Sequence, residues 1–263
     1  MRMKRLAAIL MFSTAVCHAS LIFDNIAGTA IPFATSDEVH QVILPAGYTF
    51  SFEGAPVHSV FVTSSGFVWL ENPNTSQCCT LAPQSAVENL IATNPARIMP
   101  AWTALRPDVG GTVSYAQVTD TQGARTDVTF SNVATDFNNL HQTTFQLQLY
   151  TSGMIVFSYP DFVSSDFQSV QAVILGLTGV NPSSPVAVDF TQVPMTIGNS
   201  VYDYLSTSGP AFNLTNQSLV FTPLQAGGFQ VGTTLTPEPS TFLPGAAGIF
   251  ALALIRSRQK RMN

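Results

Sequence analysis

The segment Thr143–Tyr150 limits the possible folds of this chain more than any other feature, because its residues from Phe145 onward alternate between two sets. Phe145, Leu147 and Leu149 form the apolar set, and Gln146, Gln148 and Tyr150 form the opposite set. Successive side chains of a strand point to opposite faces, so the pattern predicts a strand with one apolar face. A glycine-containing turn at 151–153 and an apolar segment at 154–159 follow. Together they predict an antiparallel hairpin.

Strand patterns continue along the body of the chain. Further β-rich segments lie at 61–63, 67–70, 112–118, 127–133, 170–177, 186–190 and 218–222. Within 127–133 we expect Val128 and Phe130 on one face and Val133 on the other. Closely spaced strands with turn signals between them predict an all-β fold, a β-sandwich.

One short helix is expected among these strands. Ser85 and Glu88 match a capping box, in which each side chain bonds to the other residue's backbone amide, and the helix would end near Thr93. Nineteen phenylalanines are enough for a sizeable core. The expected organisation is a signal peptide at 1–19, one sandwich domain at 20–224, a Gly- and Thr-containing linker at 225–236 and a C-terminal tail at 237–263.

A family resemblance appears in the body. Its pieces, in order, are Val60–Phe67, Ala96–Trp102, Gly110–Tyr115, Thr143–Tyr150 and Gly153–Phe157. In this order they resemble nidogen-like (NIDO-like) extracellular β-domains, over roughly Phe50 to Val180. The resemblance implies an extracellular matrix or adhesion context. Family members often have an Asp two residues after Trp102, but this chain has Ala104, so no role is transferred to that position.

The C-terminal tail combines a short motif, an apolar run and a basic end. Pro237, Glu238 and Pro239 precede the uncharged run 242–255. The apolar residues of the run include Phe242, Leu243, Ile249, Phe250, Leu252, Leu254 and Ile255, and the basic end contains Arg256, Arg258, Lys260 and Arg261. The fourteen residues of the apolar run would form a helix about 21 Å long. This helix is short for a bilayer core of about 30 Å, unless the side chains of the flanking arginines reach back to the membrane surface. A buried core helix is the alternative interpretation.

This arrangement resembles the PEP-CTERM sorting signal of Gram-negative bacteria. The resemblance implies an exosortase-type processing enzyme as partner and a transient transmembrane helix. The chain differs from the pattern in its short apolar run and in Pro244, which interrupts the start of that run.

The N-terminus predicts a secretory signal helix. Arg2, Lys4 and Arg5 precede the apolar stretch Leu6–Val16, and small residues place the cleavage between Ala19 and Ser20. The Sec translocon is the implied partner. Lipidation of Cys17 is the alternative.

Charge supports export of the body. Between Ser20 and Thr241 the chain has three arginines and fifteen acidic residues, so its net charge is 3 − 15 = −12, whereas the two ends carry +3 and +4. Basic flanks stay on the cytoplasmic side. The acidic body excludes nucleic acid as a partner, because phosphates require Lys and Arg.

Catalytic and metal-binding motifs are missing from the sequence. His40, His58 and His141 share no metal-ligand spacing with another ligand, so we expect neither cofactor nor metal and no enzymatic activity. Two readings remain open beside this one. Asp161 with Asp166, or Asp136 with Asn138 and Asn139, could bind calcium. A pair among the fifteen acids could instead serve a surface glycan-acting enzyme.

Two further features allow more than one interpretation. Trp69 and Trp102 could stack on sugars or pack in the core. Cys78 and Cys79 could form a vicinal disulfide. The sequence as a whole predicts an exported protein, transiently anchored in the inner membrane and then at the cell surface or extracellular. We expect a structural or adhesive role in an exopolysaccharide or biofilm context.

Overall fold

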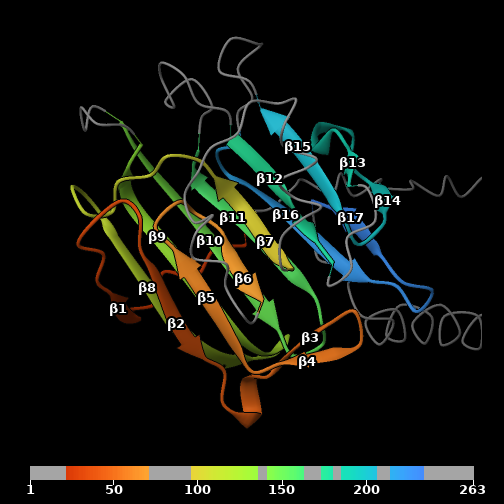
Figure 1. Cartoon of the computed structure of the whole chain (residues 1–263). Helices are drawn as coiled ribbons and strands as arrows, with labels where there is room; N and C mark the ends of the chain where they lie inside the picture. The colour runs from red at the N-terminus through yellow and green to blue at the C-terminus, as the bar shows by residue number, and fades with distance from the viewer. Residues whose placement is uncertain are drawn as a thin grey trace, which may run out of the picture.

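The fold consists of two stacked antiparallel sheets and one separate hairpin (Figure 1). The computed structural model describes residues 22–70, 96–135, 141–162, 173–179, 185–205 and 214–233. The eight-stranded sheet contains, in spatial order, β1 (Thr29–Ile31), β8 (Thr112–Asp120), β9 (Gly123–Ala134), β10 (Gln142–Tyr150), β11 (Ile155–Asp161), β16 (Gln217–Pro223), β17 (Phe229–Gly232) and β14 (Met195–Ile197). The seven-stranded sheet contains β13 (Val186–Ala187), β15 (Val201–Leu205), β12 (Val173–Thr178), β7 (Arg97–Trp102), β6 (Val68–Leu70), β5 (Ser59–Thr63) and β2 (Val39–Ile43), with only the β13–β15 pair parallel.

Short elements complete the described chain. The separate hairpin pairs β3 (Phe50–Phe52) with β4 (Ala55–Val57). Two single 3-10 turns lie at Ala46–Tyr48 and Phe190–Gln192.

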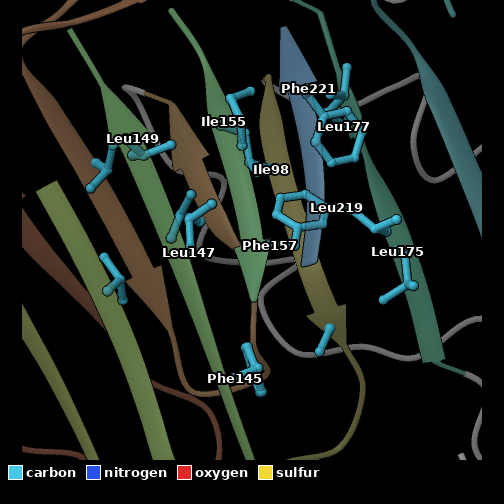
Figure 2. Packing of buried hydrophobic residues seen from close by; sticks show 14 of the residues in the cluster. Ile98, Phe145, Leu147, Leu149, Ile155, Phe157, Leu175, Leu177, Leu219 and Phe221 are labelled. Carbon is cyan, nitrogen blue, oxygen red and sulfur yellow. The ribbon is translucent and has the colours of Figure 1, made fainter. Parts of the chain in front are cut away.

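The core lies between the two sheets. Side chains from β10, β11 and β16 meet side chains from β7 and β12 in one apolar layer (Figure 2). Tyr159 of β11 also crosses this layer, where its hydroxyl donates a 2.7 Å hydrogen bond to the carbonyl oxygen of Pro100 on β7. Aligned packing of two sheets over a shared apolar layer defines a β-sandwich. The predicted β-sandwich is therefore confirmed.

A β-bulge changes the expected faces of β9. Thr143 pairs with Val133, whereas Phe145 pairs with Phe130, so β9 has one residue more than β10 across this step. The extra residue shifts the alternation, and Asn132 there has a φ of 50°. Val133 is buried in the core on the same side as Phe130, which corrects the alternation expected from the sequence.

A second bulge allows a proline in the middle of a sheet. Ile174 pairs with Trp102 and Gly176 pairs with Met99, so β7 has an extra residue around Pro100. Proline cannot donate a ladder hydrogen bond, and bulges are among the few places in a sheet where it is accepted. Pro100 is therefore compatible with β7 lying between β6 and β12.

Most predicted strands are present, with two corrections. The segment 186–190 forms a strand only at Val186–Ala187 before the 3-10 turn begins. Part of the predicted linker 225–236 is strand β17, because Phe229 and Val231 are buried and β17 pairs with both β16 and β14. The predicted helix at 85–93, the signal peptide and the sorting tail lie outside the described residues. No helix within the described residues is long and apolar enough to cross a bilayer.

Candidate functional site

Residues 22–28, which we call the N-terminal strap, cross the outer face of the eight-stranded sheet. The Ile22 amide donates to Ser218 of β16 (2.8 Å), and the Ile22 carbonyl accepts from Ser158 of β11 and from Gln148 of β10. Asp24 exchanges two backbone hydrogen bonds with the Gln146 side chain, of 3.1 and 2.9 Å. The strap thus passes over neighbouring strands and leads into β1, which forms the edge of the sheet and pairs with β8.

Polar side chains of the sheet connect to one another beneath the strap. Gln148 donates to Gln146 (2.8 Å), and the hydroxyl of Tyr150 donates to Gln148 (3.1 Å). All three side chains are buried although they lie on the polar face of β10. Buried amides and hydroxyls are tolerated only when they are hydrogen-bonded. The strap supplies part of that bonding, and the side chain of Ile22 packs against a small apolar cluster on the same face.

An arginine–carboxylate cluster holds the strap at Asp24. The guanidinium of Arg125, on β9, contacts the carboxylates of Asp24, Asp120 and Asp127 and lies 5.2 Å from the ring centroid of Tyr150. Arg125 and Asp127 are almost completely buried, whereas Asp24 and Asp120 are partly exposed. A buried ion pair requires several partners to offset its desolvation, and this arginine has them.

Two buried carboxyl groups have raised pKa values. Burial raises the pKa of Asp127 to about 6, although the positive charge of Arg125 opposes the rise. Burial likewise raises the pKa of Asp203 on β15 to about 6, while a 2.9 Å hydrogen bond from the Phe190 amide opposes it. Desolvation disfavours the charged form in both cases. Both groups therefore make stability depend on pH in the mildly acidic range.

The outer face of the seven-stranded sheet carries a second cluster, built on Arg97. Its guanidinium lies 4.2 Å from the ring centroid of Trp69 and 5.0 Å from that of Trp102. Burial lowers the pKa of Arg97 to about 9, which still leaves it charged at neutral pH. Both tryptophans are fully buried. Of the two interpretations left open by the sequence, the structure supports packing for these rings and not stacking on sugars.

A cavity of about 300 Å³ lies among the turns at one end of the sandwich. Its lining comes from the β3–β4, β10–β11 and β16–β17 turns, from the adjoining ends of β3, β16 and β17, and from Asn199. Ser51, Ser152 and Gln225 supply neutral polar groups, Leu224 supplies an apolar wall, and Glu53 supplies the one carboxylate among the lining residues. The described lining residues include no arginine or lysine. A ligand site of this size and composition suits a small polar molecule without negative charge.

The site residues predicted from the sequence lie mostly elsewhere. The sorting motif, the membrane anchor, the basic end, the cleavage position Ala19–Ser20, and Cys78 with Cys79 are all outside the described residues. Of the proposed calcium ligands only Asp161 is described, exposed at the end of β11. No group of three or more metal-ligating side chains converges among the described residues. His40 lies 3.4 Å from Glu38 and packs edge-on against Phe33.

Sequence reasoning missed both the strap and the Arg125 cluster. One signal was present: Gln146 and Gln148 occupy alternate positions of a strand, so they share a face. That pattern does not indicate whether water or another part of the chain covers the polar face of the strand. The hydrogen bonds of the strap to Gln146 and Gln148 join residues more than 120 positions apart.

Comparison with known proteins identifies the family. The model of the family described as "NIDO related" matches residues 15–223. No curated protein and no solved structure matches the chain. The match includes the segment for which a nidogen-like body was predicted and extends beyond it at both ends, so that prediction is confirmed. Because the match covers most of the 263 residues, the chain belongs to the NIDO related family.

Proposed function

We propose that this protein is exported through a PEP-CTERM-like tail and that its NIDO-related sandwich serves outside the cell as a structural or adhesive module that contacts polysaccharide. Two observations support this proposal. A NIDO-related domain suggests an extracellular β-domain. The acidic body between two basic ends suits translocation of the body.

The distribution of charge on the described surface is the observation that carries the adhesive part of the proposal. Each of the three arginines of the body is engaged: Arg97 lies among aromatic rings, Arg106 pairs with Asp108 at 2.8 Å, and Arg125 pairs with three carboxylates. Asp37, Glu53, Asp120, Asp161 and Asp189 are exposed. Such a surface repels polyanions and suits a neutral polymer.

The cavity among the turns is the contact that we propose for the polysaccharide. Its hydroxyl, amide and carboxylate groups can accept hydrogen bonds from sugar hydroxyls, and Leu224, 37% exposed, offers an apolar surface to a sugar ring. The proposed role is binding and not hydrolysis. Glycoside hydrolysis commonly uses two carboxyl groups about 5–9 Å apart, and Glu53 is the one carboxylate among the described residues that line the cavity.

Binding is tested with the mature protein and immobilised polysaccharides. We expect it to bind neutral polymers in preference to polyuronic acids, and we expect Gln225→Trp, which fills the cavity, to weaken binding at least tenfold. Thr121→Trp, in the exposed β8–β9 turn, is the matched control and should leave binding unchanged. Equal binding by both variants would remove the cavity from the proposal. A preference for the acidic polymers would contradict the electrostatic argument.

Sorting is tested in a host that carries an exosortase. The double variant Glu238→Ala/Pro239→Ala should accumulate as an uncut precursor in the inner membrane, whereas Ser240→Ala/Thr241→Ala should mature normally. Mass spectrometry of the mature C-terminus reads the outcome. Normal processing of the first variant would reject the sorting proposal and leave the binding proposal untouched.

A further inference from the structure

We propose that residues 22–31, the N-terminal strap together with β1, exchange between two copies of this chain and so link exported molecules to one another. The partner is a second copy, and its docking surface is the outer face of the eight-stranded sheet with the edge of β8. Assembly by strap exchange requires neither sorting through the C-terminal tail nor binding of polysaccharide.

The docking surface recognises mainly the backbone of the strap. Side chains of the sheet bond to the amide and carbonyl groups of Ile22 and of Asp24. The Asp24 carboxylate adds an ion pair with Arg125, and the Ile22 side chain adds an apolar contact. The same segment of a second copy presents the same groups. Exchange therefore preserves these contacts and adds only the entropic cost of association.

The connection between β1 and β2 is suited to opening. Residues 32–38 lead from the eight-stranded sheet to the seven-stranded sheet. Within this connection Phe33 is the one buried side chain, and the others are exposed or partly exposed. A bend closes it, with the Ala34 amide donating to Glu38 at 2.8 Å. An exposed connection of this kind acts as a hinge in domain swapping, and shortening it favours exchange.

Departure of the strap would leave two surfaces without their partners. The nine-residue strand β8 would become an edge, because β1 is the one described strand that pairs with it on that side. The buried amides of Gln146 and Gln148 would lose their bonds to the strap. Unpaired edges and unsatisfied buried groups favour capture of another strand. A second copy's strap satisfies both surfaces together.

The first test shortens the hinge. Deletion of Thr35–Asp37 should raise the fraction of dimers or larger assemblies above that of the unaltered mature protein, measured by light scattering after size-exclusion chromatography. Replacement of the same three residues by glycines keeps the length and should leave that fraction close to the value of the unaltered protein. Adding Asp24→Ala to the deletion should weaken the assembly at least tenfold in dissociation constant. A monomeric deletion variant would overturn the proposal.

The second test uses the unaltered mature protein and does not depend on a deletion folding. A fluorescent peptide of residues 20–33 should bind it saturably, because the peptide competes with the resident strap, and fluorescence anisotropy reads the binding. A matched peptide with Asp24→Ala should bind at least tenfold more weakly, since it lacks the ion pair with Arg125. Absence of binding at millimolar peptide, or equal binding by both peptides, would overturn the exchange.

Discussion

Replacement of Arg125 by methionine is expected to destabilise the fold more than loss of any exposed ion pair would. Methionine preserves much of the apolar volume but leaves the Asp127 carboxylate, 1% exposed, without its cation. One oxygen of Asp127 already has no hydrogen-bond partner among the described residues. Removing one member of a buried pair costs about 3–5 kcal/mol. For a domain of this size that corresponds to a fall in Tm of about 6–20 °C.

A second substitution tests the cause. Asp127→Asn in the Arg125→Met background removes the buried charge, so it should recover part of the lost free energy of unfolding, as the two sites are coupled. Arg125 lowers the pKa of Asp127, so its loss should raise that pKa further above about 6. The folded state then binds a proton that the unfolded state releases near pH 4, and stability falls as pH rises through this window. The deficit of Arg125→Met should therefore be smaller at pH 5 than at pH 8.

The assay is urea denaturation followed by tryptophan fluorescence, with Arg106→Met as control. Arg106 and Asp108 form a more exposed pair, with side chains 20% and 12% exposed, and its loss should cost about 1 kcal/mol. The reasoning would be refuted if the free energy of unfolding of Arg125→Met at pH 7 lay within about 1 kcal/mol of the wild-type value, or if adding Asp127→Asn recovered none of the lost free energy.

Three further changes test separate features of the fold. Asp203→Asn should stabilise the protein by up to about 3 kcal/mol at pH 8 and by little at pH 4. The reason is that the pKa of Asp203 is raised to about 6, so its ionisation is costly in the folded state. Denaturation curves recorded at several pH values measure the difference. Gly66→Ala should be more destabilising than Gly54→Ala. Both glycines have φ near +80°, but a Cβ at Gly66 would lie 2.3 Å from a main-chain oxygen, whereas a Cβ at Gly54 would have no atom within 4 Å. Equal melting temperatures of the two variants would contradict this expectation. Tyr159→Phe removes the hydrogen bond between the sheets and should cost about 1–3 kcal/mol, read by thermal melting.

The local alternation of residues determined much of the fold. Apolar residues at every second position of β10 fixed which face meets the core, because the side-chain period of a strand is two. The hairpin β10–β11 followed from a glycine-containing turn between two β-rich segments. These features depend on residues close together in sequence, so one sequence was enough to predict them.

Strands that break the local rules were not predictable in this way. Pro100 argues against a strand in the middle of a sheet, and only the bulge opposite β12 makes β7 acceptable there. Strand β17 lies in a segment that is rich in glycine and threonine, and its pairing with β16 and β14 decides its conformation. Each outcome depends on a neighbour that is distant in the chain.

The candidate sites divide in the same way. The sequence by itself determined the acidic character of the body, the polar face of β10 and the NIDO-like order of segments, since each can be read along the chain. Only the tertiary structure decided that the strap covers that polar face, that Arg125 gathers three carboxylates and that Trp69 and Trp102 are buried. The physical reason is that a residue's type sets what it can bind, whereas long-range packing sets what reaches it and what water can reach.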